Sequence, residues 1–495
     1  MVDPQDVIKM IFGFKAKYLR QKLGLSLEEL AERAHLSKSY LHDIEKGKKY
    51  PKVNKIQALA AALGVDYDYM VSTRASKKLQ PIVDLLTSDF IKEFPLDLFG
   101  ISPEKLFELF SNTPDKVNAF ISTIFKITRN YQMQREHLYL AALRSYQDMY
   151  DNYFADLEAA VKAFRESTGL YASPGSPPEV LEQILQERYG IRTDYTAMPR
   201  AAELRSLRSH YQPGSKTLFI NRGLSPAQTR FLLGRELAFQ YLELGERPYF
   251  TRIIEIDSFE RLLNNFKASY FAVALMMDEA HMIADLKGLA GQAEWRPELI
   301  SGLLERYDVT PEMLLQRWSN LLPQHFGIKD LFFIRLVGAA GLQHFRMTKE
   351  LHLSQMHNPY ANQMNEHYCR RWVSVNLIKQ LKSGQHTGSA PIIDAQISEY
   401  WQTDNRYLCI SLAKPDFHQP EQGVSVTIGL MINEQLRRHF RFIDSPGLPS
   451  RLVHTTCERC GISDCEARAV APTVLEQQRA KEEILRAGAT LRAGG

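Results

Sequence analysis

The sequence has few cysteines and no long apolar segment. Only five of its 495 residues are cysteines, and all lie in the last third: Cys369, Cys409, Cys457, Cys460 and Cys465. A disulfide framework is not expected in a large chain without an export signal, and the N-terminal residues lack the basic-then-apolar pattern of one. No window approaches the ~18 apolar residues of a membrane helix. We therefore expect a cytoplasmic protein with no membrane span, whose clustered thiols serve metal or redox chemistry.

An excess of positive charge is absent from most of the chain. Residues 1–78 carry 15 Lys and Arg against 9 Asp and Glu, whereas the remainder carries 46 against 48. DNA binding releases counterions and needs local positive charge, so this asymmetry favours an N-terminal polyanion-binding module. The hydrophobic fraction of 44% is typical of a globular protein. The length predicts roughly three domains.

Residues 5–72 are predicted to form five short helices, with a helical pair at the centre. Ser26 and Glu29 make a capping box, and apolar residues follow with helical spacing up to residue 34. Ser37 caps the second helix of the pair, and Gly47 ends it. Two short helices around a tight turn are typical of a helix-turn-helix. A generic helical bundle with polar residues facing water is the alternative.

The second helix of such a pair lies in the major groove, with its N-terminal side chains at the base edges. The run from residue 27 to residue 51 also resembles the Cro/C1-type (XRE) helix-turn-helix, in the pattern Ser-x-Ser-Tyr-Leu-x-x-Ile-Glu-x-Gly from residue 37. This resemblance implies double-stranded operator DNA as a partner, and a homodimer, because such modules usually read two-fold sites. The predicted DNA-binding residues are Ser37, Lys38, Ser39, Tyr40, His42 and Lys46.

Residues 73–171 are predicted to be a helical connector with one long helix. Apolar residues recur every three to four positions over about 130–167. At ~1.5 Å per residue this helix would span roughly 55 Å, enough to join two domains or to pair with a second copy. A long core helix of the following domain is the alternative. The Pro- and Gly-rich residues 172–178 mark the next domain boundary.

Residues 172–322 are predicted to be an α+β domain, with strands at 204–209 and 217–221 and helices at 178–189, 225–240 and 266–277. The domain resembles the ImmA/IrrE family of zincin-like peptidases. That family carries His-Glu-x-x-His, but this sequence has Arg235, Glu236 and Phe239 at those positions, and Lys267 replaces the acidic third ligand. A metallopeptidase needs its metal to polarise the amide and activate water. We therefore expect no enzyme activity, a structural Glu236 paired with a base, and a cleft able to bind a ligand.

Residues 323–475 are predicted to form an α+β domain with strands at 331–336, 407–412 and 424–430, followed by a C-terminal helix or tail at 476–495. The domain contains Cys457, Cys460 and Cys465 at Cys-x2-Cys-x4-Cys spacing, which allows three thiolates to converge on one metal. Cys409 lies in an apolar strand, as expected of a buried small residue. Cys369 is expected at a helix start, where the partial positive charge favours a thiolate, so we predict it as the fourth ligand. Four thiolates fit zinc or a [4Fe–4S] cluster, and free cysteines are a further alternative.

The order of these motifs resembles the short-chain acyl regulators of propionate and acetate metabolism. The shared features are Cys369-x-x-Trp372, the strand from residue 407, and the Cys-x2-Cys-x4-Cys-x-x-Arg loop with a nearby proline. The resemblance implies a [4Fe–4S] cluster on Cys369, Cys457, Cys460 and Cys465, and an acyl-coenzyme A effector in the middle region. His454, Thr455 and Thr456 replace the longer Gly/Pro approach that the family often has.

The sequence therefore predicts a multidomain transcriptional regulator. An all-α helix-turn-helix domain is followed by a helical connector, a degenerate zincin-like α+β domain and an α+β domain with the cysteine cluster. The ligand or the cluster would alter DNA affinity and so control carbon or fatty-acid metabolism genes. Two other hypotheses stay open: a metallopeptidase that cleaves a partner repressor, and a zinc-stabilised DNA-binding protein without ligand sensing.

Overall fold

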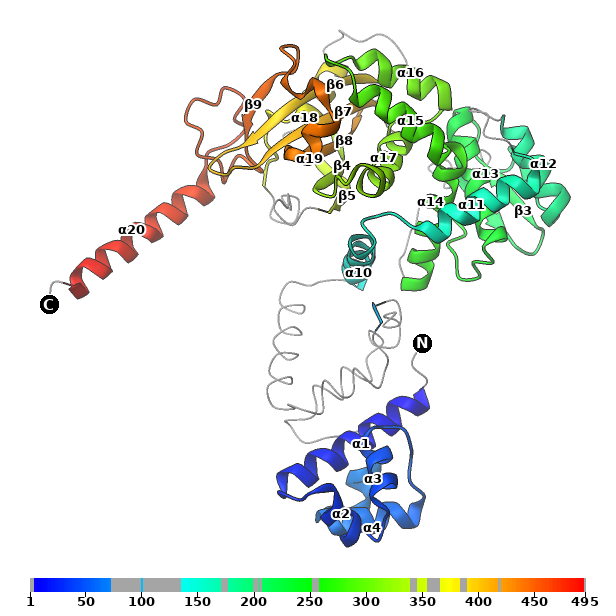
Figure 1. The fold of residues 1–495 in the computed structure, drawn as a ribbon, viewed down its shortest axis with the longest axis vertical. Coiled ribbons are helices and arrows are strands. Elements are labelled where there is room, and N and C mark those ends of the chain that lie inside the picture. The colour runs from blue at the N-terminus through cyan, green and yellow to red at the C-terminus, as the bar shows by residue number, and fades with distance from the viewer. Residues whose placement is uncertain are drawn as a thin grey trace. The chain divides into compact units, whose positions relative to one another are not determined.

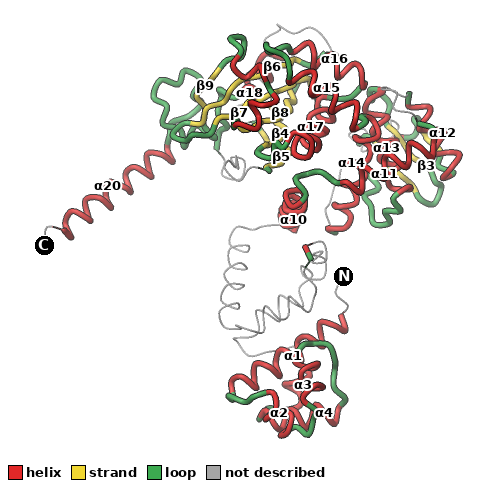
Figure 2. Tube along the Cα trace, viewed as in Figure 1, coloured by secondary structure: helices red, strands yellow, loops and turns green. Residues whose placement is uncertain are grey.

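The structure is a computed structural model of the chain (Figures 1 and 2). It describes residues 4–72, 99–100, 135–170, 177–198, 204, 207–251, 258–338, 345–353, 366–382, 390–416, 419 and 421–493. The chain divides into two compact units. The N-terminal unit comprises Met1–Tyr146 and Glu255–Leu263, and the C-terminal unit comprises Gln147–Ile254 and Asn264–Gly495.

The N-terminal unit begins with five helices, as the sequence predicts. They are α1 (Pro4–Lys22), α2 (Leu27–Arg33), α3 (Lys38–Glu45), α4 (Val53–Leu63) and α5 (Tyr67–Val71). Their core contains Leu30, Leu41, Ile44 and Leu59, all with 0% exposure. Most of the predicted connector, from residue 73 to residue 134, lies outside the described residues except for residues 99–100.

The prediction of one long helix over 130–167 is wrong. Two helices occupy the described part of this stretch, α10 (Arg135–Met149) and α11 (Ala155–Thr168). Asp151 and Asn152 break the helix with φ angles of 49° and 55°, a left-handed conformation that Asp and Asn tolerate better than most residues. The side chain of Asn152 is buried and donates to Ser319 Oγ at 3.1 Å, while the Asn152 carbonyl accepts from Asn320 at 2.9 Å. Contacts with a distant helix therefore fix a turn that the apolar periodicity conceals.

The first part of the C-terminal unit combines helices with a three-stranded sheet. Strand β3 (Thr217–Ile220) lies between β1 (Arg192–Asp194), which is parallel to it, and β2 (Ser209–Gln212), which is antiparallel. The strand predicted at 204–209 thus begins only at its last residue. The helices of this stretch are α12 (Pro178–Tyr189), α13 (Pro226–Tyr241), α14 (Phe259–Met276), whose first turn belongs to the N-terminal unit, α15 (Glu279–Ala290), α16 (Pro297–Tyr307) and α17 (Pro311–Phe326).

The second part is built on a six-stranded sheet with the order β5-β4-β8-β7-β6-β9. The strands are β4 (Leu331–Gly338), β5 (Arg346–His352), β6 (Ile392–Tyr400), β7 (Arg406–Pro415), β8 (Gly423–Met431) and β9 (Ser450–Val453). All neighbours are antiparallel except β6 and β9. The predicted strands at 331–336, 407–412 and 424–430 are confirmed as β4, β7 and β8.

Helices cover both faces of this sheet, so its strands are buried on both sides. Helices α16 and α17 contact one face, and α18 (Val373–Lys382) packs against β6, β7 and β8 on the other. Alternation along β7 sends Leu408 and Ile410 to the α17 face and Tyr407 and Cys409 to the α18 face. Helix α19 (Glu434–His439), a short 3₁₀ helix (Arg441–Asp444) and α20 (Thr473–Ala493) complete the unit.

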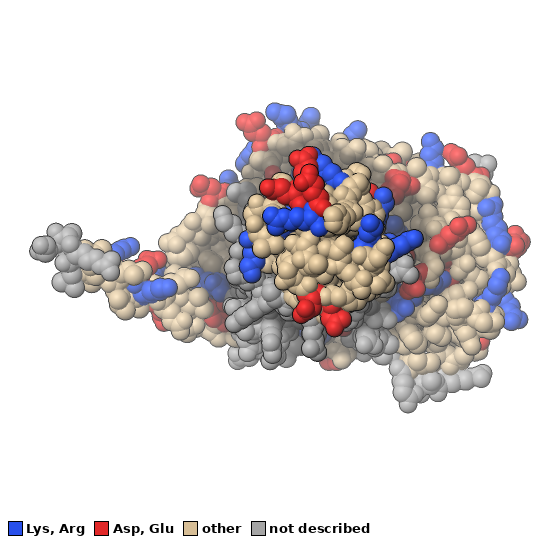
Figure 3. Space-filling model, turned by 90° about the horizontal axis from the view of Figure 1, so that it is seen from below, with Lys and Arg blue, Asp and Glu red and all other residues tan. Residues whose placement is uncertain are grey.

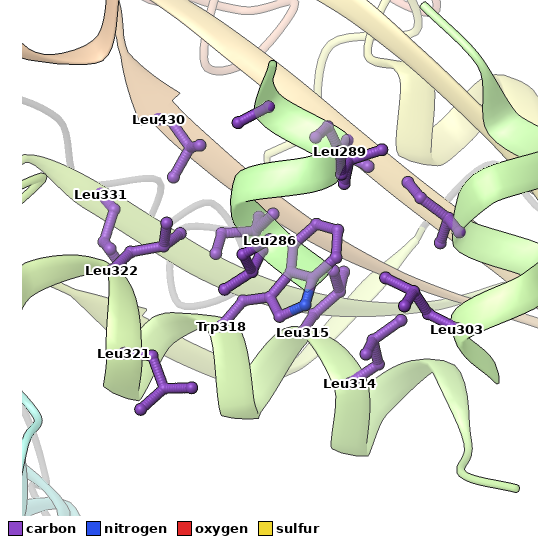
Figure 4. Packing of buried hydrophobic residues seen from close by; sticks show 14 of the residues in the cluster. Leu286, Leu289, Leu303, Leu314, Leu315, Trp318, Leu321, Leu322, Leu331 and Leu430 are labelled. Atoms are coloured by element: carbon purple, nitrogen blue, oxygen red, sulfur yellow. The ribbon is translucent and has the colours of Figure 1, made fainter. Parts of the chain in front are cut away.

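One continuous hydrophobic core joins the two parts of the C-terminal unit. Trp318 of α17 lies at its centre, surrounded by leucines of α15 and α16 and of strands β4 and β8 (Figure 4). The predicted domain boundary after residue 322 lies within α17, inside this core. A buried ion pair also links α11 to α17: the fully buried Arg317 donates to both carboxylate oxygens of Glu158 on α11. None of the helices among the described residues has the length and hydropathy needed to cross a membrane.

Acid is expected to weaken the contact between α17 and strands β4 and β5. Burial alone would raise the pKa of Glu312, but the Lys349 ammonium and the Arg335 guanidinium, 3.4 Å away, lower it to about 2. Because the folded-state pKa lies below the unfolded value, the stabilisation is complete above pH ~4.5 and is lost as the pH falls through ~2. Glu312→Gln is expected to lower the free energy of unfolding by about 2–3 kcal/mol at pH 6.

Urea unfolding followed by tryptophan fluorescence at pH 6 and pH 3 tests this prediction. The difference between wild type and Glu312→Gln is expected to fall by more than half at pH 3, because the unfolded carboxyl is then largely protonated. A difference of the same size at both pH values would show that the Glu312 charge does not stabilise the fold.

Candidate nucleic-acid interface and cysteine site

Helix α3 presents a polar face to solvent. The side chain of Ser37 accepts a hydrogen bond from the Tyr40 backbone N–H at 3.2 Å, which fixes the start of the helix. Leu41 and Ile44 are fully buried, whereas Ser39 and His42 are exposed. The buried side of α3 therefore holds the helix in place while its opposite side stays open to a partner.

The predicted DNA-binding residues differ in their contacts within the protein and in their exposure to solvent. Ser37 serves as the helix cap, and Tyr40 is half-buried. Lys38 forms an ion pair with Glu28 of α2, but both side chains are more than half exposed, so the pair contributes little stability. His42 and Lys46 are exposed at the middle and the end of the helix. Figure 3 views the N-terminal unit end-on, where basic side chains lie beside acidic ones.

Three residues that position α3 are not among the predicted site residues. Arg20 of α1 forms a bidentate ion pair with Glu45, with Nε–Oε1 2.7 Å and Nη2–Oε2 2.9 Å. Gly13 of α1 lies so close to α3 that a Cβ built there would be 2.2 Å from the Ile44 carbonyl oxygen. Glu45 belongs to the Ile-Glu-x-Gly pattern of the motif, so the sequence points to it. Nothing in the local sequence shows that Arg20 pairs with Glu45 or that Gly13 packs against α3.

The structure brings the Cys369 segment against the loop that carries the other three predicted ligands. The Cys457 N–H donates to the His367 carbonyl at 2.8 Å, and the Cys369 N–H donates to the Thr455 carbonyl at 3.1 Å. Tyr368 and Thr456 form an antiparallel bridge between these bonds. Trp372 adds a side-chain bond from Nε1 to the His454 carbonyl at 3.0 Å. Segments almost ninety positions apart thus form one small site.

The four thiols are close enough to act on one another electrostatically. Cys369 interacts with Cys457 and Cys460, and Cys460 with Cys465. Burial raises the pKa of Cys369 to about 11, although backbone groups of His454 and Arg371 oppose the shift. The expected helix start is not found at Cys369, because α18 begins only at Val373. The partial positive charge of a helix start, which would favour a thiolate, therefore does not act at Cys369.

Polar contacts hold the cysteine loop in shape. Arg468 donates to the carbonyls of Cys457 and Cys460, each at 3.2 Å, and the Ala469 N–H lies 3.5 Å from Cys457 Sγ. A Cβ at Gly461 would meet the Trp401 ring at 2.3 Å, so only glycine fits there. The arginine in Cys-x2-Cys-x4-Cys-x-x-Arg therefore satisfies loop carbonyls. The motif alone predicts a positive charge near the cysteines. It does not predict that this arginine donates hydrogen bonds to the loop carbonyls.

One ion pair and one contact between a carboxylate and an imidazole flank the loop. Glu366 accepts from Arg459 at 2.7 Å and from the Thr456 hydroxyl at 2.6 Å, and Glu458 lies 2.6 Å from the His367 ring. Burial alone would raise the pKa of Glu366, but the hydrogen bonds from Arg459 and Thr456 hold it below its usual range. These contacts fasten the loop to the segment before Cys369.

Cys409 lies apart from the loop, on β7 and under α18. Burial raises the pKa of its thiol to about 12, while a side-chain hydrogen bond with Ser398 opposes the shift. All five cysteines are free thiols, and Cys465 alone among them is half-buried rather than buried. In the part of the chain that the structure describes, no three His, Cys, Asp or Glu side chains are arranged as ligands of a single metal ion.

The positions compared with a His-Glu-x-x-His motif lie in a cleft beside β2. Arg235 and Phe239 are buried there on α13 together with Glu236. Glu236 forms a buried bidentate ion pair with Arg247, with Nη1–Oε1 2.7 Å and a second bond from Nη2 to Oε2. This agrees with the expected pairing of Glu236 with a base. Arg247 itself was not identified, because it lies in a loop without periodic pattern.

Two separate segments of the chain match known protein families. Residues 17–70 match the helix-turn-helix family model, and residues 186–319 match the family described as the IrrE N-terminal-like domain. The N-terminal domain is therefore a helix-turn-helix, and the cleft beside β2 lies in an IrrE-like domain.

Several transcriptional regulators are similar to the chain at low identity. HTH-type transcriptional regulator RamB of Mycobacterium tuberculosis is 26% identical over 261 residues, which cover 48% of this chain and 50% of RamB. The alignment thus spans about half of that relative. HTH-type transcriptional regulator PrpR of the same species is 21% identical over 370 residues, 70% of each chain. A solved structure titled Mycobacterium tuberculosis transcriptional regulator is 17% identical, with a TM-score of 0.47, over 66% of this chain and 92% of that one.

Proposed function

We propose that this protein is a sequence-specific DNA-binding transcriptional regulator that acts as a homodimer. The observation that supports this most directly is the exposed polar face of α3, whose buried side is fixed against α1. Ser39 and His42 would contact base edges, and Lys38 and Lys46 would contact phosphates. The similarity to regulators over the helix-turn-helix and beyond it supports the same function.

Binding-site selection from random duplex DNA with the full chain tests this proposal. Ser39→Ala and His42→Ala are each expected to weaken binding to the selected site about 10- to 100-fold, with little effect on unrelated DNA. Lys46→Ala is expected to weaken binding to the selected site and to unrelated DNA alike. It is also expected to reduce the slope of log binding constant against log salt concentration by about one. Lys287→Ala, an exposed charge change on α15, is the control. Selection that enriches no sequence would contradict the proposal.

We further propose that Cys369, Cys457, Cys460 and Cys465 hold a [4Fe–4S] cluster. The chemistry of the donors supports this: the four thiols lie near enough to interact electrostatically, and backbone N–H groups hydrogen-bond to three of the sulfurs, those of Cys369, Cys457 and Cys460. When bound, such a cluster supplies one-electron redox chemistry or a structural crosslink. Zinc is the alternative for four thiolates. Iron with broad absorbance near ~400 nm in anaerobically purified protein would support the cluster, whereas one colourless zinc ion per chain would support the alternative.

The effector is proposed to be a short-chain acyl-coenzyme A that binds in the middle region. The IrrE-like domain supports a ligand-binding role, because its cleft is retained while the metal-ligand positions hold Arg235, Phe239 and Lys267. A peptidase would also need a free Glu236, and Arg247 occupies both of its carboxylate oxygens. We therefore propose a binding domain without peptidase activity, in which ligand and cluster alter the DNA affinity of α3 and so control carbon or fatty-acid metabolism genes.

A further inference from the structure

A buried arginine without a carboxylate partner lies in the cleft of the IrrE-like domain. The cleft is open to solvent on one side and is lined by Tyr211, Arg235, Glu236, Phe239, Arg247 and Tyr249, among others. Arg235 is only 6% exposed, and its Nε has no hydrogen-bond partner. Its Nη2 donates to the amide oxygen of Asn265 on α14. Among the described residues, no carboxylate forms an ion pair with Arg235.

The charges around the cleft leave it positive. Among the described residues that line the cleft, Glu236 is the one carboxylate, and it is already bound to Arg247 through both oxygens. Arg247 and Arg208 repel the Arg235 guanidinium, and Glu236 attracts it from a distance without forming an ion pair with it. Burial, followed by the repulsion from Arg247, lowers the pKa of Arg235 to about 10, so that it stays charged at neutral pH. A buried charge without a counter-ion is strongly unfavourable, and an incoming anion would relieve this cost.

The aromatic walls keep the two guanidinium groups in place. Arg247 lies over the rings of Phe239 and Tyr211, at 3.9 and 4.5 Å from their centroids, and Arg235 lies 5.7 Å from the Phe239 centroid. Phe239 stands where the peptidase family has its second histidine, so one substitution both removes a metal ligand and supports the arginines. The two guanidinium groups are thus held by aromatic rings as fixed positive charges in the cleft.

We propose that this cleft binds a small anion, a carboxylate or a phosphoryl group, through the guanidinium of Arg235. A guanidinium offers planar, forked N–H donors that match the oxygens of both groups. A small carboxylate, inorganic phosphate and the phosphorylated end of a larger molecule such as coenzyme A all carry oxygens of this kind. This inference rests on the proposed ligand-binding role of the middle region and does not require DNA binding by α3.

Thermal unfolding of the full chain with sodium propionate, sodium phosphate or coenzyme A tests the proposal, with sodium chloride at equal ionic strength as the reference. At least one of the three is expected to raise Tm by several degrees in a saturable manner. A response to propionate alone identifies a carboxylate ligand, and a response to phosphate or coenzyme A identifies a phosphoryl ligand. Equal Tm values in all four salts would overturn the proposal.

Two variants separate anion binding from a structural role of Arg235. Arg235→Met is expected to abolish the anion-dependent shift and, without ligand, to raise Tm by about 2–4 °C, because it removes an uncompensated buried charge. Arg306→Gln, which removes an exposed arginine paired with Asp285, is the control and is expected to keep the full shift. A lower Tm for Arg235→Met with an unchanged anion shift would show that Arg235 is structural.

A second measurement keeps the test valid if Arg235→Met does not fold. Arg235→Lys retains the charge but loses the forked donors, so its anion affinity is expected to fall about 10-fold. Line broadening of the phosphorus signal of coenzyme A or phosphate, or of the propionate methyl signal, reports binding to the wild type directly. Absence of broadening for all three probes would overturn the proposal.

Discussion

Replacing any one of Cys369, Cys457, Cys460 or Cys465 with serine is expected to lower bound iron from about four atoms per chain to nearly zero. The expectation follows from the way the site is assembled. The three loop cysteines come from one segment, and Cys369 reaches them through two backbone hydrogen bonds and the bridge between Tyr368 and Thr456. Each thiolate would hold one corner of the cluster, so removing any of them leaves an iron without a protein ligand.

Cys409→Ser provides the matched control for this experiment. Cys409 is as buried as Cys369, with exposures of 4% and 5%, and both lie in the hydrophobic cluster under α18. Cys409 is nevertheless on the middle of β7, where its backbone pairs with Gln396 and Gly429. The Cys409→Ser variant is expected to retain the full iron content, because the cluster site loses no ligand. Iron and acid-labile sulfide, measured in protein purified without oxygen, give the readout.

The opposite pattern would reject the assignment of the four ligands. If Cys409→Ser lost iron and Cys369→Ser kept it, the fourth ligand would be on the strand and not on the segment before α18. If the wild type bound one zinc ion, and Cys457→Ser removed it, the site would be a structural zinc centre. DNA binding measured on the same variants would then show whether the centre affects α3 or only stabilises the C-terminal unit.

Local signals made the helix-turn-helix predictable. The capping box at Ser26 and Glu29 and the cap at Ser37 are contained within four consecutive residues each, and both are formed in the structure. Helix starts depend on such short-range bonds, so the sequence alone places α2 and α3. The position of α3 against α1 depends instead on Gly13, Arg20 and Glu45. These residues lie far apart in the sequence, and no local rule joins them.

Long-range contacts explain what the sequence did not predict. The apolar stripe over residues 130–167 continues through Asp151 and Asn152, and only the bonds from α17 reveal that the helix turns there. Arg235 and Phe239 show in the sequence itself that no His-Glu-x-x-His motif is present at these positions. The pairing of Glu236 with Arg247 is not evident in the sequence, because a loop residue reaches the cleft only after folding. The periodicity of apolar residues identifies helices and strands, whereas the contacts between them depend on tertiary packing.

Gly13→Ala is expected to weaken specific DNA binding at least tenfold, although alanine normally stabilises a helix. Glycine within a helix costs about 0.5–1 kcal/mol relative to alanine, so the substitution would be favourable at an open position. At Gly13, however, the added Cβ would lie 2.2 Å from the Ile44 carbonyl and 3.2 Å from the Gly47 nitrogen. Both atoms belong to the backbone at the end of α3, so no side-chain rotation can relieve the clash. Helix α3 must then shift or the unit must unfold, at a cost of about 3 kcal/mol.

Gly302→Ala on α16 is the matched control, because a Cβ there meets nothing within 4 Å. It is expected to stabilise the C-terminal unit by about 0.5–1 kcal/mol and to leave DNA affinity unchanged. Hydrogen exchange of the α1 and α3 amides, with DNA affinity measured in parallel, compares the two variants. For Gly13→Ala we expect faster exchange in both helices and at least a tenfold loss of affinity. Wild-type exchange and affinity in that variant would mean that α1 and α3 do not need their close backbone contact, and that α3 is positioned by the Arg20–Glu45 ion pair and the apolar core alone.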